Sequence, residues 1–400
     1  MIKARVRWES WTITGILGLA FFVLSIDAQS VGLQNRTVVV FVLIASLALM
    51  VGFPSRHLRR NPTAWLLIAS AGWVAAVAPL GLVPANNLAM GLSGLSLVMV
   101  SQTLVERVTF DRLLSACLVG LSSAVFLSLV SGGRADNGRV EGLFSGANAL
   151  GARGAIIVVL GFAAWVSNRS IINLVPLGLG LMALVASDGR VNVAVASLGL
   201  LLVIKTALPR FVPWLWAAMV LVFAGLSATG SLGQSTVNLV TRSGTGAELT
   251  SFTGRTGVWS ATLDGLRTFP LNGVGHAGGP IWYESIADTE LGGFNPFEAH
   301  NAVLQVAVNG GIPAAILLAL ATVSYTVLAH RHPFTIRDTV VAMIVVLGLT
   351  ESLFRVPNDI WLLFALCLAH AGSREAASLR PQPSAVSAQQ QAWTEPRFVS

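Results

Sequence analysis

The chain has 400 residues, of which 54 % are hydrophobic and only 11 % charged, and its net charge is +7. Soluble domains contain roughly 25 % charged residues, so this composition, with a mean hydropathy of +0.73, excludes an ordinary water-soluble protein. The basic residues lie at the ends of apolar runs rather than in one stripe, which argues against nucleic-acid binding.

Apolar runs long enough to cross a hydrocarbon core recur from one end of the chain to the other. Each is expected to be a helix, because an isolated strand cannot satisfy its backbone hydrogen bonds in lipid. The sequence therefore predicts an all-α polytopic membrane protein with about twelve transmembrane helices. The predicted spans are roughly 10–27, 36–53, 63–83, 87–105, 111–131, 148–167, 170–187, 191–208, 211–230, 301–329, 338–355 and 358–372.

The charges of the loops predict the orientation of these spans. The first span follows the basic sequence MIKARVRW, which is typical of a retained signal anchor, and the inner loops, such as SRHLRRN and HRHPFTIRD, are short and basic. By the positive-inside rule, both termini are cytoplasmic and the more polar loops face the outside.

The spans divide the chain into four parts. Residues 1–230 hold the first nine spans, and residues 231–299 form a long extracytoplasmic loop that carries short amphipathic helices. Residues 300–372 hold the last three spans. Residues 373–400 are rich in Pro, Ser and Gln, which predicts a disordered cytoplasmic tail.

Two arginines lie near the start of the sixth span. Arg139 belongs to the outer segment SGGRADNGRVEGLFSGAN, whereas Arg153 lies inside the span, where an unpaired guanidinium is unfavourable. Arg153 is therefore expected to face the protein interior, and both arginines are candidate substrate-binding residues. Glu351, near the outer end of the eleventh span, is a plausible partner for one of them.

Arg190 stands at the outer end of the eighth span, in the turn SDGR. One interpretation is an interfacial arginine beside lipid headgroups or paired with Asp188. The other is a guanidinium that binds an anion in an outer cavity, because ionisable residues at membrane depth are usually functional.

The stretch RTGVWSATLDGLR predicts a short helix over 255–268 that lies on the outer leaflet. Val258, Trp259, Leu263 and Leu266 recur at helical spacing, and a tryptophan suits the membrane interface. Arg255 opens this helix, where free backbone N–H groups and a guanidinium together favour a phosphate. The alternative is an ordinary amphipathic cover helix.

The turn LNGVGHAGG matches G-x-G-x-x-G through Gly273, Gly275 and Gly278. A dinucleotide site is rejected, because no strand precedes the turn and no βαβ unit surrounds it. The glycines instead predict a sharp loop after the surface helix, whose N–H groups could approach an anion.

His300 ends the acidic outer loop and begins the tenth span. It is either an ordinary residue at a helix start or, at an outer cavity, the general base for a sugar hydroxyl. Glu298 and Asp264 are the candidate carboxylates to orient or assist it. Asn301 could hydrogen-bond a sugar.

Several motifs do not occur in the sequence. There is no D-x-D, no H-E-x-x-H and no P-loop, so nothing in the sequence requires a divalent metal, ATP or another cofactor. Cys117 and Cys367 each lie inside an apolar run, which indicates buried small side chains rather than a metal site or a disulfide.

Four local sequences, in this order and spacing, resemble the O-antigen ligase and polymerase superfamily over residues 141–313. They are the SDGR turn, S-F-T-G-R-x-x-V-W at 251–259, P-L-N-G-V-G at 270–275 and A-H-N-A-V-L-Q at 299–305. The resemblance implies a metal-independent GT-C-type glycosyltransferase in the bacterial inner membrane, with its active site facing outward.

The resemblance also assigns roles to residues. It implies that Arg190 and Arg255 hold the diphosphate of an undecaprenyl-diphosphate glycan, and that His300 activates the hydroxyl of a lipid-linked or glycan acceptor. The ligase branch often shows H-N, nine residues, then G-x-x-T. Here Ala314 stands at the last position, which weakens the choice of ligase over polymerase.

Two other classes of function are weighed against transfer. A flippase for the same lipid predicts charged or broken helices near the bilayer midplane, whereas most predicted spans are uninterrupted and the polar residues gather at the outer edge. A purely structural membrane protein leaves Arg190, Arg255 and His300 without a reason for their positions.

Overall fold

A computed structural model describes residues 2–26, 61–105, 108–134, 138–207, 255–290, 298–330, 333–354 and 357–378. Within these ranges the chain is helical, with connecting turns, no strand and one isolated β-bridge between Arg134 and Val140. The predicted all-α class is confirmed. Ten of the twelve predicted spans coincide with helices, while 36–53 and 211–230 lie outside the described residues.

Six of the described helices are long and apolar enough to cross a membrane: α3 with its 3₁₀ extension, α4, α5, α6, α8 and α14. The bounds of all described helices are α1 Ile2–Ser25, α3 Pro62–Val77, η2 Ala78–Leu80, α4 Pro84–Leu104, α5 Phe110–Ser131, α6 Ala147–Asn168, η3 Ile171–Asn173, α7 Leu174–Ser187, α8 Arg190–Ala207, α12 Arg255–Thr268, α13 Gly278–Glu290, α14 Ala302–Ala329, α15 Ile336–Gly348 and α16 Asp359–Ser378.

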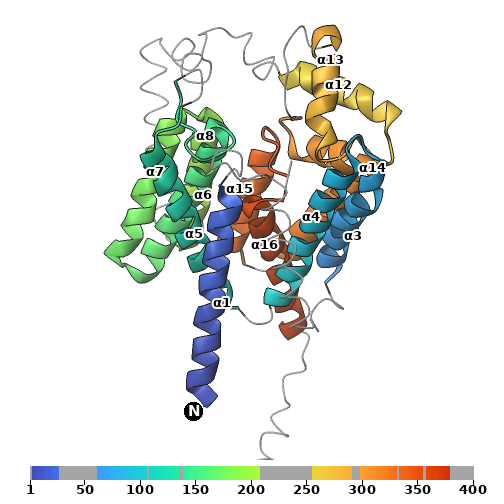
Figure 1. The fold of residues 1–400 in the computed structure, drawn as a ribbon. Helices are drawn as coiled ribbons and strands as arrows, with labels where there is room; N and C mark the ends of the chain where they lie inside the picture. Colours follow the sequence, from blue (N-terminus) through green and yellow to red (C-terminus); the bar gives the residue numbers. More distant parts are fainter. Residues whose placement is uncertain are drawn as a thin grey trace, which may run out of the picture.

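The helices form two packed groups joined by a central pair (Figure 1). Helices α1, α5, α6, α7 and α8 pack together on one side, and α3, α4 and α14 pack on the other. Between them, α15 contacts α8 and α16 contacts α4. Helices α12 and α13 gather at one end of the bundle, and the N-terminus of α1 projects from the opposite end.

Helix α14 is broken inside its span. Gly310 (φ −147°, ψ 18°) and Gly311 (φ 79°, ψ 177°) leave helical geometry just before Pro313. The turn over 270–275 supplies the lost hydrogen bonds: the N–H groups of Val274 and Gly275 both donate to the carbonyl of Val308, at 2.8 and 3.1 Å. The Ile312 N–H donates to the carbonyl of Pro270.

The Gly-rich turn therefore packs into the break in α14 and hydrogen-bonds to its backbone. Gly273 and Gly275 have φ of 60° and 87°, so the predicted sharp loop is present. A Cβ atom at Gly273 would lie 2.3 Å from the Val308 carbonyl oxygen, which only glycine avoids. Because the N–H groups of 274 and 275 are occupied by Val308, they do not form the predicted approach to an anion.

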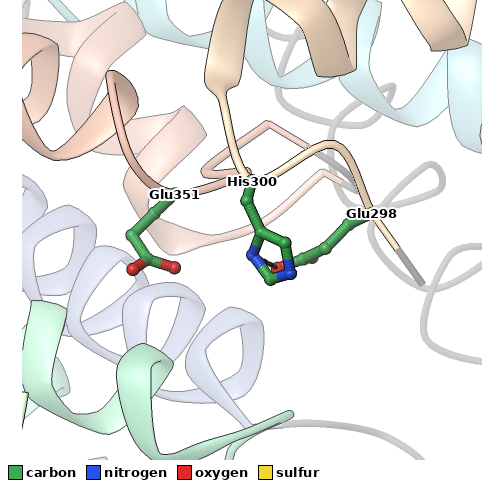
Figure 2. Close-up of side chains that lie close together, drawn as sticks. All are labelled: Glu298, His300 and Glu351. Atoms are coloured by element: carbon green, nitrogen blue, oxygen red, sulfur yellow. Dashed lines mark ion pairs between the residues drawn. The ribbon is translucent and has the colours of Figure 1, made fainter. Parts of the chain in front are cut away.

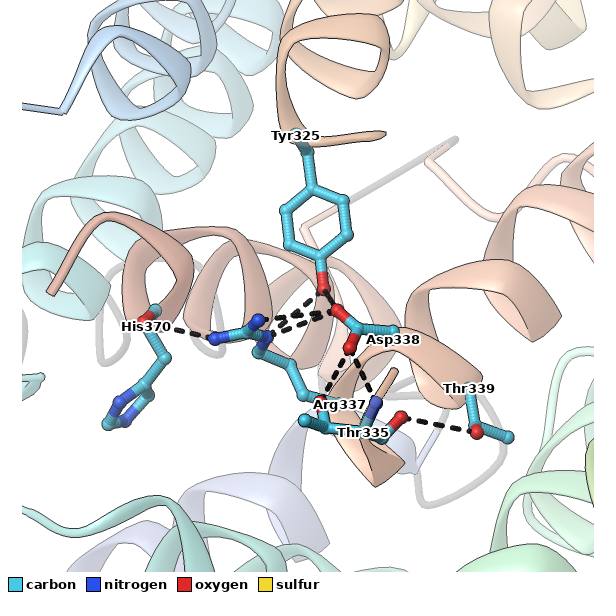
Figure 3. Close-up of polar contacts among 6 residues, drawn as sticks. All are labelled: Tyr325, Thr335, Arg337, Asp338, Thr339 and His370. Carbon is cyan, nitrogen blue, oxygen red and sulfur yellow. Dashed lines mark hydrogen bonds and ion pairs between the residues drawn. The ribbon is translucent and has the colours of Figure 1, made fainter. Parts of the chain in front are cut away.

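A buried polar cluster joins the last turns of α14 to α15 and α16 (Figure 3). The Tyr325 hydroxyl donates to Asp338 at 2.5 Å, and Arg337 Nη1 donates to the carbonyl of His370 at 3.2 Å. Asp338 also accepts from the Thr335 N–H and hydroxyl, which closes a capping box at the start of α15. These contacts fix the spacing of the three helices.

Candidate functional site

Three segments meet at the α12–α13 end of the bundle: the 138–146 loop before α6, the 298–301 turn before α14 and the loop after α15. The predicted eleventh span, 338–355, is wrong at its outer end, because α15 ends at Gly348. Residues 349–354 beyond it lie in turns and bends. Glu351 is thus a loop residue, placed among the other two segments.

Glu351 is the centre of a chain of polar contacts. Its Oε1 accepts from Arg255 Nη2 at 2.9 Å and from Asn148 Nδ2 at 3.1 Å. Asn148 in turn accepts at 2.7 Å from Arg139, whose Nε also donates to the Ser187 carbonyl. The direct partner of Glu351 is therefore Arg255, and Arg139 reaches it only through Asn148.

The burial of Glu351 has an electrostatic consequence. Its side chain is only 10 % exposed, and loss of solvation raises the pKa of this carboxyl to about 7. The positive charge of Arg255 opposes this rise in pKa and the nearby Glu298 reinforces it. The raised pKa means that this carboxyl takes up a proton more readily than a solvated glutamate does.

His300 lies beside Glu351 and Glu298 (Figure 2). Its Nδ1 is 3.5 Å from Glu298 Oε1, and both side chains are 24 % exposed. His300 has a left-handed backbone (φ 49°), which is uncommon outside glycine and is often found at functional positions. The 3.5 Å separation of Nδ1 from Glu298 Oε1 is an ion-pair distance, which applies when the ring is protonated, and no hydrogen bond joins the two atoms.

The ligand atoms of Glu298, His300 and Glu351 lie within 4.8 Å of one another, a spacing that could hold a metal ion. Arg255 already places a cation at 2.9 Å from Glu351 Oε1. Because a second cation there would be repelled by the guanidinium, the donor set suits proton transfer better than metal binding.

Arg190 begins α8 close to this cluster. Two residues further on, Asn192 Nδ2 donates to the Asn148 carbonyl at 3.3 Å. Arg190 Nη1 is buried and has no hydrogen-bond partner within the described part of the chain, and no ion pair there joins Arg190 to Asp188. A buried donor without a partner is unfavourable unless a ligand satisfies it.

Three predicted residues lie outside the cluster or have other partners. Arg153 is buried, as expected, and forms a bidentate ion pair with Asp359 at 3.0 and 2.5 Å. Asp264 is exposed and pairs with Arg267 on the surface of α12 at 2.8 Å. Asn301 caps α14 by accepting from the N–H groups of 303 and 304. Substrate contacts for these residues stay predictions.

The structure adds residues that sequence reasoning missed. Tyr283 of α13 is fully buried and shares a 2.7 Å hydrogen bond with Thr262 of α12, and burial raises the pKa of its phenol. It packs with Val258 and Ala299, so the two short helices support the turn that carries His300. Asn148, Gln305 and Asn309 were also missed, although the last two stand at helical spacing from Asn301.

Part of the chain is similar to a known protein family. Residues 175–319 match the family model described as O-Antigen ligase. The matched residues include Arg190, Arg255 and His300, whereas Arg139 and Glu351 lie outside them. A search of curated proteins found no match. The resemblance that the four local sequences indicate is confirmed.

Proposed function

We propose that this chain, which matches the O-antigen ligase superfamily, transfers a glycan from an undecaprenyl-diphosphate carrier to an acceptor hydroxyl at the outer face of the bacterial inner membrane. Members of the family are glycosyltransferase-like enzymes. The observation that carries the proposal is the grouping of Arg255, His300 and Glu298 at one end of the bundle. A buried Arg190 donor nearby has no hydrogen-bond partner among the described residues.

In the proposed reaction, His300 Nε2 takes the proton of the acceptor hydroxyl while its oxygen attacks the anomeric carbon of the donor sugar. The bond between that carbon and the diphosphate oxygen breaks, and the electron pair leaves with undecaprenyl diphosphate. Arg190 and Arg255 stabilise the negative charge that grows on the leaving group. Glu298, 3.5 Å from Nδ1, accepts from Nδ1–H when the two side chains approach, which favours the tautomer in which Nε2 carries no proton.

In the proposed reaction Arg255 exchanges its present partner, Glu351, for the diphosphate of the donor. A diphosphate competes with Glu351 for the guanidinium of Arg255. Since the pKa of Glu351 is about 7, this carboxyl can take up a proton when Arg255 turns to the diphosphate. The negative charge of Glu351 is then removed as that of the donor arrives, which favours the exchange.

A polymerase of the same superfamily is the second candidate. It would use a carrier-linked chain as the acceptor, and Ala314 at the position where ligases often carry threonine supports it. A transporter gains one feature from the structure, the broken helix α14. That break is filled by the 270–275 turn, which leaves few free backbone groups for a transported substrate.

The test is a reconstituted transfer assay with EDTA present. Purified protein receives an undecaprenyl-diphosphate oligosaccharide and candidate acceptors, and free undecaprenyl diphosphate is measured. We expect acceptor-dependent release that EDTA does not reduce, and the size of the product separates ligase from polymerase.

Substitutions of single residues test the proposed roles of the two arginines and of His300 in this assay. Arg190→Ala, Arg255→Ala and His300→Ala should each lower the rate by a factor of about 100 or more, whereas Arg267→Ala, an exposed arginine of the same helix as Arg255, should leave it unchanged. Full activity of His300→Ala would remove the proposed base. Lipid movement between leaflets without release would favour the transporter.

A further inference from the structure

The first turns of α14 carry three carboxamide side chains at four-residue spacing: Asn301, Gln305 and Asn309. Residues four apart lie on one face of a helix, one turn above another. Gln305 and Asn309 are each only 1 % exposed. Two amides buried at this depth require hydrogen-bond partners, and those partners belong to the loops of the proposed site.

The contacts run without a gap from one loop to the other. Gln305 Oε1 accepts from the N–H of Ala299 at 2.9 Å, between Glu298 and His300. Gln305 Nε2 donates to Asn309 Oδ1 at 3.0 Å, and Asn309 Nδ2 donates to the carbonyl of Phe354 at 3.0 Å.

A third amide joins the same two loops nearer the surface. Asn301 Nδ2 donates to the carbonyl of Leu349 at 3.2 Å. Leu349 and Phe354 flank Glu351 on either side, so the loop that carries Glu351 is attached to α14 at both ends.

The direction of these hydrogen bonds is fixed by the backbone. The Ala299 N–H can only donate and the Phe354 carbonyl can only accept, so Gln305 must present its oxygen to the first and Asn309 its nitrogen to the second. The remaining pair, Gln305 Nε2 and Asn309 Oδ1, then matches as donor and acceptor. In this orientation each of the three hydrogen bonds joins a donor to an acceptor.

We propose that Gln305 and Asn309 are positioning residues that hold the His300 turn and the Glu351 loop at a fixed separation. The inference rests on the proposed transfer reaction, because it assigns these residues to the geometry of its general base. Both side chains are 1 % exposed and hydrogen-bond to the backbone of the two loops. Their effect is indirect, since displacement of a catalytic group by about 1 Å lowers a rate by about 100-fold.

The activity test compares Gln305→Met, Asn309→Leu and the double variant with wild type. Each single change leaves two polar groups without a partner, and so does the double change, since the inner amide pair is removed together. We therefore expect each variant to lower kcat by about 10- to 100-fold with KM within about twofold. The double variant should lose no more than the worse single variant.

Ser70→Ala is the matched control, because Ser70 donates a buried 2.9 Å hydrogen bond to the Ala314 carbonyl of the same helix, beyond the break. It should leave kcat unchanged. A fall in kcat for Ser70→Ala equal to that of the amide variants would overturn a specific positioning role, as would a double variant whose losses multiply.

Hydrogen exchange measured by mass spectrometry tests the positioning without the reaction. Peptides covering 298–301 and 349–354 should take up deuterium faster in the amide variants than in wild type or Ser70→Ala. Unchanged uptake would overturn the inference even if kcat falls. If wild type shows no transfer at all, the proposed function fails, and the exchange rates still decide whether the amides hold the two loops together.

Discussion

Glu351 shows how a single buried carboxyl can respond to pH. Its pKa of about 7 in the folded protein lies above the ordinary value of 4.5. Between these two values the folded state binds more protons than the unfolded state. The contribution of Glu351 to stability is therefore fully present below about pH 4.5 and is lost as pH rises through about 7.

The loss of stability with rising pH gives a prediction for Glu351→Gln. The glutamine keeps an oxygen that can accept from Arg255 and Asn148, but it does not titrate. The apparent Tm of wild type should fall more than that of the variant when the pH is raised from about 5.5 to about 8. This interval brackets the pKa of about 7. Thermal unfolding in detergent measures the difference. Equal changes in Tm would contradict the raised pKa.

Single residues were predictable from the sequence where their own chemistry decides their position. Arg153 had to face the interior because it lies inside an apolar span, and it is buried. Its partner Asp359 was missed, because the two are 206 positions apart and no local pattern encodes such a contact. The same holds for Arg255 and Glu351, whose pairing depends on how distant helices pack.

Helices were predictable to within a few residues where hydrophobicity alone defines them. The span expected at 87–105 is α4, Pro84–Leu104, and proline at the first helical position accounts for the earlier start. The span expected at 301–329 was placed correctly as α14, but its break was missed. The Gly-Gly-x-Pro sequence at 310–313 was the local signal for this break. That residues 270–275 pack into the break depends on tertiary structure, which the local sequence does not encode.

The break in α14 makes Gly311 a specific prediction. Gly311 has φ of 79°, and an added Cβ would lie 2.3 Å from the backbone carbon and oxygen of Leu271. Gly311→Ala should therefore destabilise the protein by about 1–3 kcal/mol from backbone strain alone, with the clash in addition. Apparent Tm and the yield of folded protein in detergent measure this loss.

Gly178→Ala is the control for this substitution. Gly178 lies within α7, and an added Cβ would have no atom within 4 Å. Alanine is favoured over glycine inside a helix by about 1 kcal/mol, so this variant should be as stable as wild type or more so. A Gly311→Ala protein with the same Tm as Gly178→Ala would show that the turn over 270–275 does not pack in the break.

Two polar clusters lie at different ends of the described helices. The site described above lies at the α12–α13 end, and the Tyr325–Asp338 cluster lies at the other end of α14. Composition and periodicity predicted the helical class and the location of ten helices, because both depend on the length of apolar runs, although the span expected at 338–355 ends earlier, at Gly348. How the helices group around α15 and α16 could not be predicted, since apolar runs of similar composition do not specify their neighbours.

The two ends of α14 allow the orientation in the membrane to be tested. Arg267 on α12 and Phe334 in the loop before α15 are both exposed. Arg267 follows Leu266, which packs against Ala307 and Ala315 in the first half of α14, whereas Phe334 follows the other end of this helix. If the positive-inside orientation is correct, Arg267 faces the outside and Phe334, within the basic segment HRHPFTIRD, faces the cytoplasm.

Cysteine labelling in intact cells distinguishes the two sides. A membrane-impermeant maleimide should label Arg267→Cys directly, and Phe334→Cys only after the membrane is permeabilised. The native thiols, Cys117 and Cys367, are buried, so wild type provides the unlabelled background. Labelling of Phe334→Cys alone in intact cells would invert the topology. Because the diphosphate carrier would then have to be used on the cytoplasmic side, this result would also contradict the proposed transfer at the outer face.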